Sequence, residues 1–319
     1  MAIPTVLTSE DSGAPALTGQ DGAMRAVLKW ALPLLGWSEE FDDAANEKVV
    51  FRNNPTNGSG YYIQVLDKAS LLFLAGADQA EISAFLTMSD VNTGTGQTPL
   101  QNGTSQVSYL VKSATANATE RKYEIIGNET AFIFLVEIEP ENDPGWVVHF
   151  VGDAVPRDPV DNMFLLMCPS GESTVYDSVP EITGLTSGGD PKFRVLVSHD
   201  GVTTNLTGRL TGLSPISGSS SLVIGHEGKF IDPVTGDSYV GNFWVTDTNV
   251  DAVRGRLPGL FVPFGDWLGN LGNNKLQLTN IQTDLGTKDL QYVRWRERSN
   301  TLVPNDGAVL IDKTGDWSG

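Results

Sequence analysis

The chain has 319 residues, with 39 Asp and Glu against 21 Lys and Arg, so its formal net charge is −18. Proteins that bind nucleic acid gain affinity by setting positive groups against phosphates, and this balance excludes nucleic acid as an expected partner. With 40% hydrophobic and 19% charged residues, the composition is that of a globular protein, and the length suggests about two domains. No apolar run approaches the roughly 18 residues that span a bilayer, so we expect no membrane insertion.

The start of the chain and its cysteine content bear on the compartment. The first residues, MAIPTVLTSEDSGAP, have neither the positive segment nor the long apolar segment of a secretory signal. We therefore expect synthesis and assembly in the cytosol. The single cysteine, Cys168, has no second cysteine with which to form an internal disulfide, and no histidine lies near it in the sequence. We predict that it is a small buried hydrophobic residue.

One segment, residues 22–32 (GAMRAVLKWAL), has the periodicity of an α-helix. Asp21 is the predicted N-cap and Pro33 the predicted end of this helix. The acidic stretch that follows, residues 38–47 (SEEFDDAANE), is expected to be a solvated loop. One face of the helix would carry the apolar residues Met24, Val27, Leu28 and Ala31.

From Lys48 onward, short runs of β-branched and aromatic residues alternate with clusters of Gly, Asn, Pro and Thr, which is typical of a mostly antiparallel β protein. Two of these runs, Tyr123 to Ile126 and Ala131 to Val136, are separated by GNET and predict a hairpin. The predicted strands of the first half are KVVFR from Lys48, YYIQVLD from Tyr61, EISAFLTM from Glu81, VSYLVKS from Val107, RKYEIIG from Arg121, AFIFLVEIE from Ala131 and WVVHFVGD from Trp146.

Glycine and proline collect at residues 179–191 (VPEITGLTSGGDP), where we place a domain boundary. Residues 1–185 hold 9 Lys and Arg against 25 Asp and Glu, a net charge of −16, whereas residues 186–319 hold 12 against 14, a net charge of −2. We predict a mainly β protein with two β-sandwich or barrel-like domains, residues 1–185 with the single helix and residues 186–319. The predicted strands of the second half are KFRVLVS, TNLTGRL, SLVIG, NFWVTD, KLQLTNIQ, LQYVRWRE and AVLID.

No motif in the sequence indicates a catalytic or cofactor site. Residues 93–96 (TGTG) lack the following helix and lysine of a phosphate-binding loop, so we expect a loop between strands. The three histidines are scattered, and no Gly-x-Ser-x-Gly elbow is present. We therefore predict no cofactor, no metal and no enzymatic activity. Four aspartates in turn-rich stretches match no calcium-binding loop and are expected to form turns: Asp232, Asp237, Asp247 and Asp251.

Two features suggest protein–protein contacts. Arg294, Arg296 and Arg298 fall two apart, so on a strand they share one face with Tyr292. Such a face is either solvated or paired with carboxylates, and the acidic half of a neighbouring copy or another protein would supply them. The second feature is the segment RGRLPGLFVPFGDW.

In this segment, Arg254 and Arg256 precede a cluster of large apolar residues, while Gly and Pro are expected to prevent a long regular element. The cluster either fills the core of the second domain, which is the preferred interpretation, or forms the apolar centre of a contact with another subunit. Its members are Leu257, Leu260, Phe261, Val262, Phe264 and Trp267.

The order of several segments resembles a family of tailed-bacteriophage virion structural proteins. These segments are SEDSGAPALTGQDGAMRAVLKWAL, FLTMSDVNTGTGQTP, YLVKSATANATERKYEIIGNETAFIF, VRGRLPGLFVP and AVLIDKTGDW, which together span nearly the whole chain. Members of the family commonly carry a Gly-Ala-Pro segment, an Ala-Val-Leu helix, a Met-Ser-Asp stretch ending in Thr-Gly-Thr-Gly, and an Arg-Gly-x-Leu-Pro-Gly-Leu segment. The corresponding residues here are Gly13 to Pro15, Ala26 to Leu28, Met88 to Gly96 and Arg254 to Leu260.

The resemblance implies a structural subunit of a virion and brings no catalytic residues. It suggests an accessory of the tail, baseplate, tail tip or head-to-tail connection, whose partners are other virion proteins and copies of itself. A capsid decoration (cement) protein is the nearest alternative. A host-surface glycan-binding module is another, because seven Trp and seven Tyr provide aromatic faces on which sugars stack. A virion-associated hydrolase is a third, since paired carboxylates need only be neighbours in space.

Overall fold

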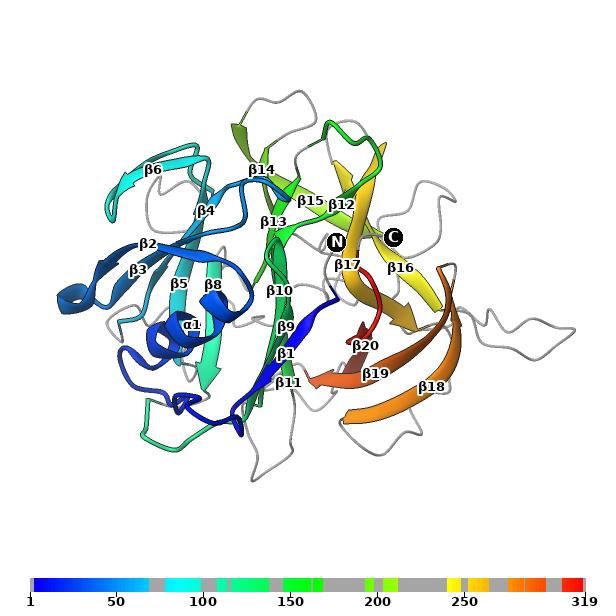
Figure 1. Ribbon diagram of the computed structural model, residues 1–319, viewed down its shortest axis with the longest axis horizontal. Helices are drawn as coiled ribbons and strands as arrows, with labels where there is room; N and C mark the ends of the chain where they lie inside the picture. Colours follow the sequence, from blue (N-terminus) through cyan, green and yellow to red (C-terminus); the bar gives the residue numbers. More distant parts are fainter. Residues whose placement is uncertain are drawn as a thin grey trace, which may run out of the picture.

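The computed structural model describes a mainly β protein with one α-helix among the described residues, as predicted (Figure 1). Thirteen strands form one continuous sheet, five form a second sheet and two form a separate hairpin. Within the described part of the chain, no helix is both long and apolar enough to cross a membrane. The described residues are 3–68, 78–98, 108–113, 116–137, 146–161, 163–168, 193–197, 203–211, 240–247, 252–263, 275–283, 285–296 and 306–317.

The centre of the molecule is a layer of strands buried on both faces. In β10, alternate residues enter two separate hydrophobic clusters: Phe132 and Phe134 face the N-terminal layer, whereas Ile133 and Leu135 face the C-terminal strands. Figure 1 shows the helix and the five-stranded sheet on one side of this layer and the C-terminal strands on the other. The central strands are β9 (Tyr123–Gly127), β10 (Ala131–Glu137), β11 (Trp146–Asp153) and β13 (Phe164–Met167), with β1 (Thr5–Thr8) at the edge of the sheet beside β9.

The helix α1 (Ala23–Leu34) buries the predicted apolar face, namely Met24, Val27, Leu28, Ala31 and also Leu32. The predicted cap at Asp21 is wrong, because Gly22 occupies the N-cap position with a φ of 78° and no side chain caps it. The carboxylate of Asp67 instead accepts bonds from the first helical N–H groups, at 2.7 and 3.1 Å. The predicted end at Pro33 is also wrong by one residue, since proline in the last turn removes only the bond that its nitrogen would donate.

The five-stranded sheet has the order β2-β3-β4-β5-β8, and four of its strands were predicted. The acidic stretch after the helix is not a loop, because its first half forms the exposed edge strand β2 (Ser38–Asp43) against β3. Lys29 of the helix lies 3.0 Å from Glu39 and 2.7 Å from Asp42, which lets this charged strand lie beside the helix. The other strands are β3 (Lys48–Arg52), β4 (Tyr62–Leu66), β5 (Asp78–Phe85) and β8 (Ser108–Ser113).

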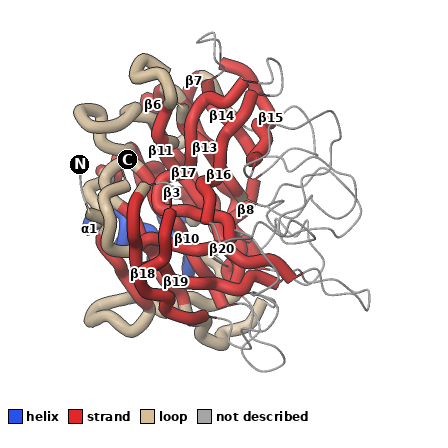
Figure 2. Tube along the Cα trace, turned by 90° about the vertical axis from the view of Figure 1, so that its right-hand side faces the viewer, coloured by secondary structure: helices blue, strands red, loops and turns tan. Residues whose placement is uncertain are grey.

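The C-terminal strands close into a barrel-like ring. Strand β16 pairs with β17, and the pairing continues through β20, β19 and β18 back to β16, where one parallel bridge joins Val240 to Thr283. Figure 2 shows these strands from another side. Their bounds are β14 (Phe193–Val197), β15 (Thr203–Thr211), β16 (Val240–Asp247), β17 (Ala252–Pro263), β18 (Lys275–Thr283), β19 (Gly286–Arg296) and β20 (Asp306–Asp312).

The described part of the segment rich in Gly and Pro, residues 254–263, belongs to the strand β17, which corrects the expectation that these residues prevent a long regular element. In β17, Arg256 pairs with Trp244 and Phe261 with Asn242, so the residues between them bulge out of the ladder. The bulge places Gly259 at a φ of 70° and Pro258 where the chain leaves its partner strand. Sequence reasoning thus located the irregularity correctly but overestimated its length.

The predicted domain boundary, residues 179–191, lies outside the described residues. Two strand pairs join the residues before this boundary to the residues after it: β13 pairs with β14, and the short strand β12 (Val155–Pro156) pairs with β17. One hydrophobic cluster also contains residues from both halves, including Phe150 and Leu257. The two predicted halves therefore share one sheet and one part of the core.

The predicted strands that fall on described residues are present, and the predicted hairpin is the antiparallel pair β9–β10. The predicted strand SLVIG lies outside the described residues. The predicted loop at residues 93–96 is wrong, because Thr93–Thr95 form the strand β7, which pairs with β6 (Thr87–Asp90) in a hairpin. Sequence reasoning missed β1, β2, β7, β12 and β13, because these strands are short, charged or follow polar segments.

Candidate functional site

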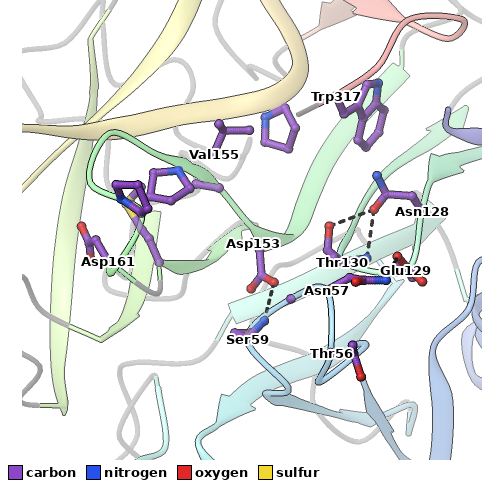
Figure 3. Close-up of a pocket in the computed structure, with 16 residues that line it drawn as sticks. Thr56, Asn57, Ser59, Asn128, Glu129, Thr130, Asp153, Val155, Asp161 and Trp317 are labelled. Carbon is purple, nitrogen blue, oxygen red and sulfur yellow. Dashed lines mark hydrogen bonds between the residues drawn. The ribbon is translucent and has the colours of Figure 1, made fainter. Parts of the chain in front are cut away.

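A pocket of about 560 Å³ lies where loops from the two large sheets meet (Figure 3). One wall is the loop between β3 and β4, residues 53–60, and another is the turn between β9 and β10, residues 128–130. The segment after β11, one residue of β17 and the C-terminal Trp317 complete it. The lining residues are Thr56, Asn57, Gly58, Ser59, Asn128, Glu129, Thr130, Asp153, Ala154, Val155, Pro156, Pro159, Asp161, Met163, Pro258 and Trp317.

Asp153 holds the loop 53–60 in place. Its Oδ2 accepts hydrogen bonds from the backbone N–H of Ser59 at 2.8 Å and from Asn53 Nδ2 at 2.9 Å. Gly58 passes so close that a Cβ there would lie 2.5 Å from the same Oδ2 and 2.9 Å from Thr130 Cγ2. The loop therefore requires glycine at this position for steric reasons.

Glu129 is held from the same loop by two asparagines. The side-chain amide of Asn54 donates to Oε2 at 2.8 Å, and that of Asn57 donates to Oε1 at 2.7 Å. Asn54 also shapes the loop, because its Oδ1 accepts from the backbone N–H groups of Thr56 and Asn57 at 2.8 and 3.1 Å. Each oxygen of Glu129 accepts one of these bonds and keeps further acceptor capacity for a ligand.

Several polar groups of the lining have no partner among the described residues. Asn128 uses its Oδ1 to accept from Thr130 and Ala131, but its Nδ2 donates to no described group. The hydroxyl of Thr56 and the Oδ1 of Asn57 are likewise without a hydrogen bond to a described residue. Figure 3 shows Asn57, Asn128 and Glu129 gathered on one side of the pocket. The pocket thus offers both donors and acceptors to a ligand.

The lining is acidic, but two of its carboxyl groups, those of Asp153 and Asp161, present little free negative charge to the pocket. Burial raises the pKa of the Asp153 carboxyl to about 6, although hydrogen bonds from Ser59 and Asn53 oppose the shift. Its Oδ1 is shielded from solvent and has no hydrogen-bond partner in the described part of the chain. Asp161 is neutralised by Arg254, whose Nε donates to Oδ2 at 2.9 Å. Among the lining residues that the structure describes, there is no Lys, Arg or His.

The structure brings only part of the predicted interface to this site. Arg254 reaches the pocket wall through its pair with Asp161, and the same segment contributes Pro258. Arg256 is buried, and Leu257, Leu260, Phe261 and Tyr292 belong to the chain's own hydrophobic clusters, which agrees with the preferred interpretation of the apolar segment.

The remaining predicted interface residues cannot be placed as side chains. Arg294 and Arg296 lie on β19, as a strand prediction requires, but only their backbone is described. Arg298, Phe264 and Trp267 lie outside the described residues, and the predicted arginine face remains a prediction.

The other candidates from the sequence have structural explanations where they are described. Cys168 is buried, as predicted. In the described ranges, no three His, Cys, Asp or Glu residues are grouped so as to hold a metal ion. Of the four turn-forming aspartates, Asp247 ends β16, while Asp232, Asp237 and Asp251 lie outside the described part.

Sequence reasoning missed the pocket residues because they were classified as turn formers. GNET separates the two strands of the predicted hairpin, and NNPTNGSG is one of the clusters of Gly, Asn, Pro and Thr between the predicted strands. The asparagines in both segments are typical turn residues. The only signal in the sequence was that both segments are rich in asparagine, since each connects two consecutive strands, β3 to β4 and β9 to β10. Their proximity depends on how the two sheets pack, which the local sequence does not encode.

Comparison of the chain with protein-family models and with curated protein sequences gives no match.

Proposed function

We propose that this chain is a non-enzymatic structural component of a tailed-bacteriophage virion. The observation that carries the proposal is the order of the four characteristic segments, from Gly13 to Pro15 through Arg254 to Leu260, over most of the chain. Each segment is short and common by itself, whereas all four segments in the same order are hard to obtain by chance.

The positions of these segments are consistent with a scaffold role. The helix segment packs into the N-terminal core, and the Met88 to Gly96 segment forms the exposed hairpin β6–β7. The Arg254 to Leu260 segment joins the C-terminal ring to the central layer through Leu257 and Leu260.

Within the virion, we propose an accessory of the tail, baseplate, tail tip or head-to-tail connection that binds other virion proteins and copies of itself. The net charge of −18 disfavours a position against packaged DNA. Capsid decoration is the alternative position, since it satisfies the same charge argument.

Labelling of intact virions tests the proposal. Virions of the phage that encodes the chain are purified by density gradient, checked for the chain by mass spectrometry and labelled with a specific antibody and gold. Gold at the tail end supports the tail or baseplate role, and gold spread over the head supports decoration. Absence of the chain from purified virions by both methods contradicts the proposal.

A further inference from the structure

The polar pocket of the candidate site restricts the chemistry of any ligand. Among the described residues, its lining holds carboxylates, amides and hydroxyls but no Lys, Arg or His, and the Arg254 guanidinium at its wall is already paired with Asp161, so the described lining offers no unpaired positive charge to a phosphate, sulfate or carboxylate ligand. A volume of about 560 Å³ is in the range of sites for small organic molecules and far exceeds the space that a single ion needs. The ligand is therefore a hydrophilic organic molecule that is not anionic.

The free hydrogen-bonding groups distinguish between a cation and a neutral ligand. Asp161 is paired with Arg254, and the Oδ1 of Asp153 is shielded from solvent. Of the lining carboxylates in the described part of the chain, only Glu129 has neither limitation. Calcium requires six or more oxygen ligands, which one carboxylate and scattered amides do not supply. The charge of the lining is thus too weakly exposed to select a cation.

We propose that this pocket binds a neutral saccharide. Sugar hydroxyls both donate and accept, and they match a lining that presents acceptors on Asn57 and Glu129 beside donors on Asn128 and Thr56. Glu129 is already oriented by two amide donors, so binding would not require it to change conformation. Val155, Pro156 and Pro159, which are partly or fully exposed, supply an apolar part of the wall against which the C–H faces of a sugar can pack.

This inference goes beyond the proposed virion role and does not depend on it. A saccharide site would give a virion protein a contact with host surface glycans, and the same site would bind sugars if the chain acted elsewhere. Failure of saccharide binding would leave virion labelling unaffected, and failure of virion labelling would leave the binding measurement unaffected.

The test uses the full-length chain and saturation-transfer NMR, followed by calorimetry on the sugars that bind. The probes are methyl glycosides of neutral hexoses, 6-deoxyhexoses and N-acetylhexosamines, together with their disaccharides. Calcium chloride, spermidine and a sialylated trisaccharide are run in parallel as a divalent cation, an organic cation and an anionic sugar.

Two substitutions remove free groups without breaking internal bonds. Thr56→Val deletes a hydroxyl that bonds no described residue, and Asn128→Asp keeps the Oδ1 that binds Thr130 while replacing the free donor. Thr119→Val is the matched control, because the Thr119 N–H bonds Asn117 Oδ1 at 3.1 Å, as Thr56 bonds Asn54, but on an exposed segment outside the pocket.

We expect at least one neutral saccharide to bind, with Thr56→Val and Asn128→Asp each weakening binding by about threefold to tenfold. Thr119→Val should bind as the wild type does. Three results would overturn the proposal: no neutral saccharide binds the natively folded chain, binding is unchanged in both pocket variants, or only the cations or the anionic sugar bind.

Discussion

Replacing Asp153 by asparagine tests the central electrostatic feature of the pocket. The carboxyl has an ordinary pKa of 3.8, and burial raises it to about 6 in the folded chain. The asparagine variant keeps an oxygen that accepts from Ser59 and Asn53, and places an amide where the unpartnered Oδ1 lay. The substitution therefore removes the titrating charge while preserving the contacts that hold the loop.

The sign of the effect follows from the raised pKa of Asp153. A group whose pKa is higher in the folded state contributes stability below its unfolded pKa and loses this contribution as the pH rises through the folded pKa. The difference between 3.8 and about 6 corresponds to about 3 kcal/mol in the free energy of unfolding. About 2 kcal/mol of this is expected between about pH 4.5 and about pH 8.

Urea unfolding of the wild type and Asp153→Asn across this pH range measures the effect. The stability of the variant relative to the wild type should increase with pH by the stated amount, and titration common to both proteins cancels in the difference. Asp90→Asn, on the exposed hairpin β6–β7, is the control, because hydrogen bonds from its own turn lower the pKa of Asp90 and leave its difference flat over this range. A difference for Asp153→Asn that is equally flat would refute the argument.

Three further predictions concern the packing of the layers. His149 accepts from the Val111 N–H, and burial lowers its pKa to about 4. In urea titrations, the stability of the wild type relative to His149→Gln should therefore fall by about 3 kcal/mol on acidification from about pH 6.5 to pH 4, a comparison in which the opposite contribution of Asp153 cancels. Gly259→Ala should lower the free energy of unfolding in chemical denaturation by about 3 kcal/mol or more, because the φ of Gly259 is 70° and a Cβ would lie 2.3 Å from the Trp317 indole. The control Gly286→Ala, where φ is 94° and no atom lies within 4 Å, should lower it by about 1 to 2 kcal/mol. Lys112→Met removes the ammonium that lies 2.5 Å from the fully buried Asp67 carboxylate and should lower the free energy of unfolding by about 3 to 5 kcal/mol. Adding Asp67→Asn to this variant should restore part of the melting temperature that it loses.

Local residue patterns determined most of the secondary structure of this protein. The β-branched and aromatic runs from Lys48 to Asp153 predicted strands because side-chain spacing alone shows which residues fit a pleated surface. The same reasoning predicted the buried face of α1, whose apolar residues recur at helical spacing. It failed for β2, whose charged residues form a strand only because β3 supplies hydrogen bonds and the helix supplies Lys29.

Only the tertiary structure decided how these elements are layered and where the pocket lies. The apolar run in β10 predicts a strand, but whether it packs on one face or two depends on the helix and the C-terminal ring that cover it. Asn57, Glu129 and Asp153 are far apart in sequence and meet because the two sheets pack together at their loops. The raised pKa of Asp153 arises from the burial that this packing causes, and so a sequence, which states composition but not burial, could not indicate it.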